Sequence, residues 1–451
     1  MKARYQFRFY PTDQQKQLLA QLFGCVRVVW NDALAICKQS EKLPSNNDLQ
    51  KLVITQAKKT DERSWLSDVS NIPLQQSVAD LGVAYKNFFN SLKGKRKGKK
   101  VGSPKFKKKT ARQSARFRIG GFSIKGDEVY LAKIGSIKPI WSRSLPSGFA
   151  SFDSTETAKT RTCSPSRGSY TKKMRQAYYN EYTTTLTNQP RQSLPHFLGD
   201  NASAPSSVTV IKDCANRYFL SFVVEIEPIQ SNAKNQSIGI DLGIKTFAVM
   251  SNGETAVSPN YSQKDRKIRK LQRKLARQQK GSKRREVTRL RIAKQHNQIA
   301  DTRKDFLHKL STKVVSENQV IVLEDLNVSG MVKNRKLARV ISLQGWREFR
   351  VLCEAKSEKL NREFKVISRW EPTSQTCSCC GYRWSKLDLS IRSVLCLNCG
   401  TEQDRDENAA RNINKVGIGH CHDSKRARRE GKTGLPAHLG EVSRITDPLG
   451  R

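Results

Sequence analysis

Two Cys-x-x-Cys pairs constrain the fold of this chain more than any other feature of its sequence. Fifteen residues separate the pair Cys377 and Cys380 from the pair Cys396 and Cys399, a spacing typical of a four-cysteine zinc site. Each pair is expected to lie on a tight turn, so that four thiolates close a tetrahedral shell around one Zn²⁺. Such a shell has no position for a substrate, so the zinc is predicted to be structural and the chemistry to lie elsewhere. Cys379 is an alternative ligand in the first pair, although the spacing favours Cys380.

The charge of the chain indicates a polyanionic partner. Lysine and arginine number 83 against 40 aspartate and glutamate residues in 451, a formal net charge of +43. Self-repulsion of this size destabilises a compact protein unless a polyanion neutralises it, so nucleic acid is the expected partner. The basic residues are spread over most of the chain and not gathered in one amphipathic helix, which argues against a membrane surface as the partner.

The sequence also indicates where the protein resides. The N-terminus has no signal-peptide core, and no apolar run approaches the length of a membrane span. Eleven cysteines, of which only four have paired spacing, fit a reducing compartment. We therefore expect a soluble cytoplasmic protein, associated with the nucleoid when it is bound to DNA, or a nuclear protein if the host is a eukaryote.

Hydrophobic periodicity divides the chain into segments of different character. A polar stretch from 148 to 204 is rich in Ser, Thr, Asn, Gln and Pro, and we expect it to be a disordered insert, with a partner-binding excursion as the alternative. The tail after residue 413 has no periodicity, and its His420, Cys421 and His422 fit a loose tail better than a metal site. Strand patterns are predicted at 2–10, 114–145, 207–212, 218–226, 237–250, 319–324 and 364–368, and helical patterns at 11–29, 49–57, 74–92, 263–310 and 344–362.

Two very basic segments are the candidate nucleic-acid contacts. Residues 93–109 combine many lysines with glycines and are predicted to track a phosphate backbone as a loop, with a solvated loop that has no partner as the alternative. Residues 263–310 combine a thin apolar stripe with many basic residues, and Gly281-Ser282 is expected to break them into a two-helix hairpin. The individual candidates are Lys95, Arg96, Lys97, Lys105, Lys107 and Lys108 in the loop, and Arg266, Arg269, Lys270, Arg273 and Arg277 in the hairpin.

Three acids occupy the ends of predicted elements. Asp241 stands at the turn after a buried strand, and Glu324 ends a second, nearly continuous apolar strand. Asp406 opens a helix and shares its inward face with Ala410 and Ile413. Converging carboxylates need a counter-charge, and oxygen ligands favour Mg²⁺ or Mn²⁺. An acid from a hairpin, a central strand and a helix is the arrangement of an RNase H-like nuclease, in which two such ions activate water for phosphodiester hydrolysis.

Two of these assignments have alternatives. An Asp at a tight turn often only caps its own backbone, which is the alternative interpretation of Asp241. Asp404 is a second candidate for the third acid. Its position favours a role as the N-cap of the helix, with Asp406 nearer the buried face.

The same residues resemble those of the TnpB family, transposon-encoded relatives of the type V CRISPR effectors. The zinc pairs followed by the Asp-x-Asn-Ala-Ala motif form a specific combination, and the resemblance covers nearly the whole chain apart from 148–204 and the tail. The matching motifs are Phe9-Tyr-Pro-Thr12, Asn87-Phe88-Phe89, Gly239-Ile-Asp241-Leu-Gly243, Leu323-Glu324-Asp325-Leu326, Pro372-Thr-Ser-Gln-Thr-Cys377-Ser-Cys-Cys380-Gly381, Cys396-Leu-Asn-Cys399-Gly400 and Asp404-Arg-Asp406-Glu-Asn408-Ala-Ala-Arg-Asn-Ile413.

The resemblance implies a multidomain α/β plus β-barrel protein. Its RNase H-like, or RuvC, nuclease domain would contain the zinc ribbon as an insertion, and its N-terminal wedge β-barrel would contain a helical recognition domain. The implied boundaries are 1–10 for the first wedge strand, 11–110 for the recognition domain with its basic loop, 111–236 for the wedge barrel interrupted by the insert, 237–376 for the nuclease domain, 377–400 for the zinc ribbon, 401–415 for the third nuclease motif and 416–451 for a basic disordered tail.

The resemblance further implies RNA-guided cleavage of DNA. A guide RNA from the end of the mobile element and double-stranded target DNA would be the partners, with one protein on one RNA and cleavage beside a short flanking motif. Asp241 would bridge both Mg²⁺ ions, Glu324 would bind one and Asp406 the other. The insert splits a wedge segment and could hinder that domain. The alternatives are a nuclease-inactive, RNA-guided DNA-binding repressor and an accessory protein of DNA-joining transposition.

Overall fold

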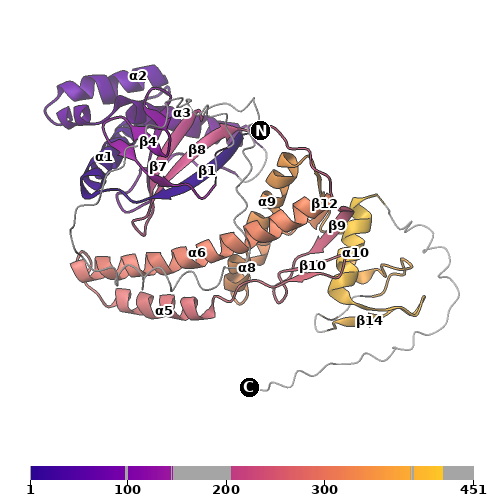
Figure 1. Ribbon diagram of the computed structural model, residues 1–451. Coiled ribbons are helices and arrows are strands. Elements are labelled where there is room, and N and C mark those ends of the chain that lie inside the picture. The colour runs from indigo at the N-terminus through magenta and orange to yellow at the C-terminus, as the bar shows by residue number, and fades with distance from the viewer. Residues whose placement is uncertain are drawn as a thin grey trace, which may run out of the picture.

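The computed structural model describes residues 2–96, 100–143, 145, 205–385, 388 and 391–419. Two lobes, each with its own hydrophobic core, are joined by one long helix that runs beneath the first lobe and into the second (Figure 1). The candidate contact Lys97, the insert 148–204 and the segment with His420, Cys421 and His422 lie outside the described residues.

The N-terminal lobe contains two antiparallel sheets that share one core. The first strand, β1, alternates exposed and buried side chains as predicted, with Tyr5, Phe7 and Phe9 buried. Val129, Leu131 and Ile137 of the smaller sheet belong to the same core cluster. The five-stranded sheet has the order β2-β7-β8-β1-β6 and the smaller sheet the order β3-β4-β5, with β1 (Lys2–Phe9), β2 (Gln113–Arg118), β3 (Phe122–Lys125), β4 (Glu128–Leu131), β5 (Gly135–Ile137), β6 (Pro139–Ile140), β7 (Ser207–Lys212) and β8 (Tyr218–Glu225).

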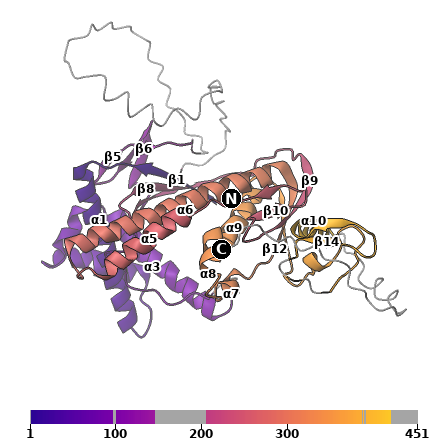
Figure 2. The same cartoon turned by 90° about the horizontal axis from the view of Figure 1, so that it is seen from below.

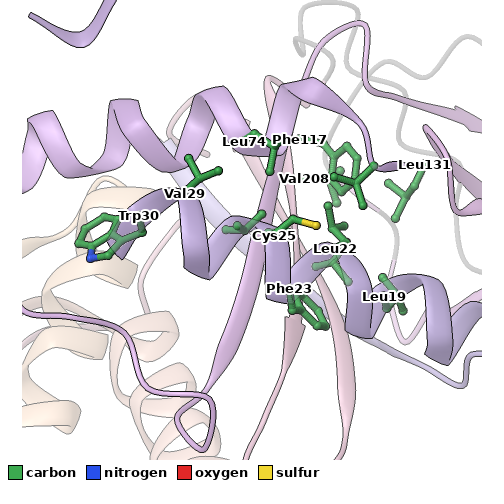
Figure 3. Close-up of a cluster of buried hydrophobic side chains, with 14 of the residues drawn as sticks. Leu19, Leu22, Phe23, Cys25, Val29, Trp30, Leu74, Phe117, Leu131 and Val208 are labelled. Atoms are coloured by element: carbon green, nitrogen blue, oxygen red, sulfur yellow. The ribbon is translucent and has the colours of Figure 1, made fainter. Parts of the chain in front are cut away.

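Helices pack on one side of this lobe. Helix α1 (Asp13–Gln39) begins at a capping box in which Gln15 N–H donates to Thr12 Oγ1 and Thr12 N–H to Gln15 Oε1. Its apolar face packs with α3 (Asn71–Leu92) against the sheet, as the side chains of Leu22, Leu74 and Phe117 show in Figure 3. Between them lie α2 (Asn46–Gln50), a π-helical turn (Lys51–Gln56) and short 3-10 turns (Ala57–Lys59, Ser64–Asp68).

Helix α1 corrects one expectation from the sequence. It is the one helix in the described residues that is long and apolar enough to cross a membrane, although no run was expected to approach that length. Half of its most apolar window is buried inside the structure, where Leu19, Val29 and Leu34 contribute to the lobe's core. A core helix of a folded domain passes the same test of length and composition, so this feature is weak evidence for a membrane.

The C-terminal lobe is built on a mixed five-stranded sheet of order β11-β10-β9-β12-β13. Strand β12 runs parallel to both β9 and β13, whereas β10 is antiparallel to β9. Helices cover both faces of β12, as predicted for a continuous apolar strand. The bounds are β9 (Asn235–Asp241), β10 (Ala248–Met250), β11 (Thr255–Ala256), β12 (Asn318–Glu324) and β13 (Glu363–Ile367).

The predicted two-helix hairpin is present, and its second helix joins the lobes. It consists of α5 (Ser262–Ala276) and α6 (Lys283–Glu317), separated at Gly281, whose φ of +87° favours glycine. The lobes meet where Asp301 of α6 forms an ion pair with Arg217 and Asn297 donates to Asp213, and both views show α6 extending beneath the N-terminal lobe (Figure 2). The helices α7 (Val328–Met331), α8 (Ala338–Gln344) and α9 (Trp346–Lys359) follow β12.

The chain then forms the cysteine-rich segment and a last helix. A two-stranded ribbon, β14 (Ser393–Leu395) and β15 (Glu402–Asp404), leads directly into α10 (Arg405–Gly417). Residues 416 and 417 were expected in a disordered tail but belong to this helix, because Gly417 packs closely against the Val322 side chain.

Candidate active site and zinc site

Asp241 and Glu324 are the last residues of two neighbouring parallel strands. Ile240 of β9 is paired in register with Leu323 of β12, so the two acids follow one residue later at the same edge of the sheet. Adjacent strands lie about 4.8 Å apart, which makes these acids close neighbours. The carboxyl ends of parallel strands are where α/β sheets bind their ligands.

The alternation of side chains along the strands shows which face of the sheet the acids occupy. Successive side chains in a strand alternate between faces, and Ile240 and Leu323 point into the core cluster formed with α6 and α9. Asp241 therefore lies on the opposite face, where Val322 packs against Ile413 of α10, whereas Glu324 at the end of its strand also lines a cleft with residues of α9.

Helix α10 packs along strand β9, and each turn of the helix lies beside the next second residue of the strand. Asn414 Nδ2 donates to Ser237 Oγ at 3.0 Å, and a Cβ on Gly239 would lie closer than 3.0 Å to the Ala410 carbonyl oxygen. Only glycine permits this close approach of helix and strand. One turn before Ala410 stands Asp406, and two residues after Gly239 stands Asp241, so the packing brings these two acids toward each other.

The electrostatics of the acids agree with this placement. Burial, together with the negative charges of Asp406 and Glu324, raises the pKa of Asp241 from 3.8 to about 7. The pKa of Glu324 is also raised, by burial and by the charge of Asp325, with Arg369 opposing the shift. The Arg392 guanidinium forms an ion pair with Asp406 at 3.1 Å. The site therefore holds more negative charge than its surroundings neutralise, and divalent cations fit such a set of carboxylate oxygens.

The three acids are less tightly gathered than ligands of a single ion. Among the described residues, the His, Cys, Asp or Glu side chains that lie close enough together to hold one metal ion are the four cysteines. Two ions about 3.5–4 Å apart, each about 2.1 Å from its oxygens, span about 8 Å between outer ligands. The three acids are therefore not arranged as the ligands of one ion, and a site for two ions stays a prediction.

Asp404 serves as the helix cap. Its carboxylate accepts the backbone N–H groups of Asp406 at 2.9 Å and Glu407 at 3.0 Å. The prediction that Asp404 caps this helix is thereby confirmed. Because the Asp404 carboxylate holds the first turn of α10, Asp406 is the better of the two candidates for the third acid.

The four cysteine sulfurs form a compact cluster. All four Sγ atoms lie within 4.8 Å of one another, with 3.8 Å between Cys377 and Cys399 and 3.6 Å between Cys380 and Cys396. Tetrahedral Zn²⁺ with Zn–S bonds of about 2.3 Å separates its sulfurs by about 3.8 Å, so the residues fit zinc. Cys379 is exposed and outside the cluster, which confirms the choice of Cys380.

Hydrogen bonds attach the cysteine cluster to α10. The Asn408 side chain accepts the Ser378 N–H at 2.7 Å and donates to the Thr376 carbonyl at 2.9 Å. The amide of Asn412 donates to the same Thr376 oxygen. Gln403 Nε2 donates to Cys377 Sγ at 3.3 Å. The helix that carries Asp406 is therefore fixed to the zinc segment through two buried asparagines.

The predicted basic loop is held against helix α1. Trp30 Nε1 donates to the Lys105 carbonyl, and Asn31 bonds both the N–H and the carbonyl of Lys107. The Lys107 ammonium lies 3.7 Å from the centre of the Trp30 ring, and burial lowers its pKa. Lys107 thus has a packing role that the sequence did not reveal, whereas Lys105 and Lys108 are exposed. Lys95 and Arg96 are at the described start of the loop.

The basic face of the hairpin is exposed as expected. On the opposite, apolar face Ile268 is buried, and Leu271 and Leu275 are partly buried. Arg269 lies 3.5 Å from Asp265, within one turn of the same helix. The exposed candidates on this face are Arg266, Arg269, Lys270, Arg273 and Arg277, and their contact with nucleic acid remains a prediction.

A group of arginines beside Glu324 was not predicted from the sequence. A cleft of about 380 Å³ is lined by Glu324 together with Arg347, Arg350 and Arg369. Asp325 pairs with Arg350 at 2.8 Å and with Arg369, and these guanidiniums lower the pKa of Asp325. The spacing of Arg347 and Arg350 on one turn of α9 was the signal in the sequence, but isolated arginines on a helix usually face solvent.

Three family profiles match the chain. The profile described as "Probable transposase" matches residues 221–335, and the "Cas12f1-like, TNB domain" profile matches residues 346–413. A profile described as "Helix-turn-helix domain" matches residues 1–42, which here form one strand and one long helix. The first two profiles together include the three acids and the four cysteines.

Relatives extend the match over the whole chain. A protein of Streptomyces pristinaespiralis named "Putative RNA-guided DNA endonuclease" is 35% identical, covering 100% of this chain and 99% of its own. The similarly named InsQ of Escherichia coli is 28% identical, covering 92% of each chain. A solved Cas12f1–sgRNA–target DNA complex matches 92% of this chain and 98% of its own, with 12% identity and a TM-score of 0.48. With full-length identity of this degree to its relatives, the chain belongs to the TnpB family.

Proposed function

We propose that this protein is an RNA-guided DNA endonuclease of a mobile element. A guide RNA from the element's end would select double-stranded target DNA by base pairing, beside a short flanking motif, and a RuvC-like site would hydrolyse the phosphodiester. The full-length relatives named as RNA-guided DNA endonucleases support this assignment. A net charge of +43 suits a protein that holds a heteroduplex by its backbone.

The observation that carries the nuclease proposal is the packing of α10 on β9. It brings Asp406 toward Asp241, and the strand register places Glu324 beside Asp241. The raised pKa of Asp241 means that its carboxyl is protonated in part at neutral pH unless positive charge is supplied. In the proposed site the carboxylates of Asp241, Glu324 and Asp406 would hold the Mg²⁺ or Mn²⁺ ions. When bound, these ions would activate a water and stabilise the leaving oxygen.

The proposed roles of the other parts follow from the fold. The strand order β11-β10-β9-β12-β13, with one antiparallel side and parallel β9, β12 and β13, supports an RNase H-like nuclease domain. The two sheets that share a core in the first lobe support a wedge barrel, and α1–α3 the inserted recognition domain. A zinc ion on the four cysteines would hold the ribbon and α10 in place. We propose one protein on one RNA, located in the cytoplasm and on the nucleoid.

The test is cleavage by the protein purified with co-expressed RNA. One discrete bound RNA species, and cleavage of DNA matching its guide only when Mg²⁺ is present, is the expected result. Asp241→Asn should abolish cleavage and keep the RNA, whereas Asp305→Asn, an exposed acid of α6, should cleave as the wild type does. Unchanged cleavage by Asp241→Asn would refute the metal assignment. Guided binding without cleavage by the wild type would instead favour the repressor alternative.

A further inference from the structure

The cleft beside Glu324 has the shape and charge of a binding site. It is bounded by Leu242 and Leu323 at the sheet edge, by residues 327–329 after β12 and by the first turns of α9. Glu324 is the proposed catalytic acid in its lining, and three arginines are its other charged groups. An anionic group beside Glu324 would therefore meet positive charge on the cleft wall.

The three arginines are not equivalent. Asp325 neutralises part of the charge of Arg350 and Arg369 by pairing with both. Arg347 is exposed and forms no hydrogen bond or ion pair with another described residue. Two carboxylates, Glu324 and Asp325, against three guanidiniums leave a net positive charge, and Arg347 is the group free to bind a phosphate oxygen.

An exposed tryptophan stands next to this cleft. Trp370 directly follows Arg369, and it lies three residues after Ile367, the residue paired in register with Glu324. Its side chain is 86% exposed, the largest exposure among the large apolar residues of the described chain. The turn that carries it is held by Trp370 N–H donating to Ser368 Oγ and Glu371 N–H donating to the Ser368 carbonyl. The indole ring is thus presented to solvent from a hydrogen-bonded turn.

A free indole ring beside a cationic cleft suits one kind of ligand. Aromatic side chains stack on the flat faces of bases that are not paired, while arginines bind the phosphates between them. Bases inside a duplex have both faces covered by their neighbours. The cleft and the exposed ring together suit an unpaired strand.

We propose that Trp370 and Arg347 hold the single DNA strand that is being cut, with Trp370 stacking on a base and Arg347 binding a phosphate next to the scissile one. This inference rests on the proposed nuclease function. Trp370 is a positioning residue in this arrangement, because it fixes the strand over the acids and takes no part in the bond exchange. Base–aromatic stacking of ordinary strength corresponds to about a 5- to 150-fold effect on binding.

The direct test is photocrosslinking in the RNA-bound complex. Asp241→Asn keeps the DNA uncut, and a target with 5-iodouracil near the cleavage position is irradiated and the crosslinked peptide identified by mass spectrometry. We expect the crosslink at Trp370 with the DNA strand. A crosslink mapped elsewhere, or one formed only with the guide RNA, would overturn the proposal. This readout needs no cleavage, so it separates failure of this inference from failure of the nuclease function.

Binding and kinetics of variants give the second test. Trp370→Ala should raise the KM for a single-stranded DNA substrate by about 5- to 150-fold, and Trp370→Phe should retain most of the wild-type affinity. Tyr130→Ala removes another exposed ring, from β4 in the other lobe, and should leave the KM unchanged. Arg347→Ala should weaken binding and reduce its salt dependence by about one ion. Wild-type KM in a folded Trp370→Ala protein would refute the stacking role.

Discussion

Replacing Asp241 by asparagine should stabilise the magnesium-free protein near neutral pH while it abolishes cleavage. The Asp241 carboxyl is partly buried and faces the charges of Asp406 and Glu324, which together raise its pKa from 3.8 to about 7. Asparagine has the same shape without the charge, so the repulsion disappears. A residue placed for ion binding is thus expected to destabilise the fold in the absence of its ions.

The sign and size of this effect follow from proton binding. Between about pH 4 and pH 7 the folded chain keeps the proton on Asp241 and the unfolded chain has lost it, so stability falls as the pH rises through this window. A pKa difference of about 3 units, at about 1.4 kcal/mol per unit, sets a ceiling of about 4 kcal/mol. Solvent around the partly exposed carboxyl reduces the effect below this ceiling. Above about pH 7 both states are ionised and the contribution no longer changes.

The assay is the thermal midpoint of the zinc-loaded protein in magnesium-free buffer from pH 5 to pH 8. The wild type should lose several degrees relative to Asp241→Asn, because 1 kcal/mol moves the midpoint of a domain of 150–250 residues by about 2–4 °C. Added Mg²⁺ should restore the wild type and leave the variant unchanged. Asp305→Asn should follow the wild type. A wild-type midpoint that rises with pH relative to Asp241→Asn would refute the proposed crowding of the acids.

Three further substitutions test the packing, the zinc site and the cap. Gly239→Ala should destabilise the protein by about 1–3 kcal/mol or more in a urea melt and reduce cleavage, because the new methyl group meets the backbone of α10. Gly24→Ala in helix α1 is the control, because the methyl group added there would meet nothing within 4 Å beyond its own helix backbone. This control should be neutral or stabilising by up to about 1 kcal/mol. Cys380→Ser should lower the zinc content measured by metal analysis, and Cys379→Ser should keep one zinc per chain. Asp404→Ala should cost about 1 kcal/mol of stability and retain cleavage in Mg²⁺, whereas complete loss of cleavage in a folded Asp404→Ala protein would indicate that it is the third acid.

The acids could be found from the sequence because strand ends leave a local signal. Two apolar runs identify β9 and β12, and Asp241 and Glu324 each end their run. The register between these strands, which are more than 70 residues apart in the chain, has no local signal and depends on the tertiary fold. The match between turns of α10 and positions of β9 likewise depends on a close approach at Gly239 that only the packing reveals.

Charged residues were harder to interpret because sequence does not show what they pair with. Lys107 was predicted as a phosphate contact. In the structure its ammonium lies over the Trp30 ring, and its backbone N–H donates to Asn31, which is 76 positions away along the chain. Arg347 and Trp370 lacked any distinguishing pattern, since one exposed arginine or aromatic residue in a turn is common on protein surfaces. The position of Trp370 near Glu324 follows from the pairing of β12 with β13, whereas Arg347 reaches the cleft from α9.

Helix α10 explains why the zinc segment and a proposed catalytic acid are adjacent in the chain. Its first turn carries Asp406, its middle rests on Gly239 of the central sheet, and its two buried asparagines bond the segment that contains Cys377. Loss of zinc would therefore change the position of Asp406, because Asn408 and Asn412 connect its helix to the cysteine-rich segment. The sheet that carries Asp241 and Glu324 would keep its own core. A metal shell closed by four sulfurs can thus determine the position of a carboxylate that it does not contact.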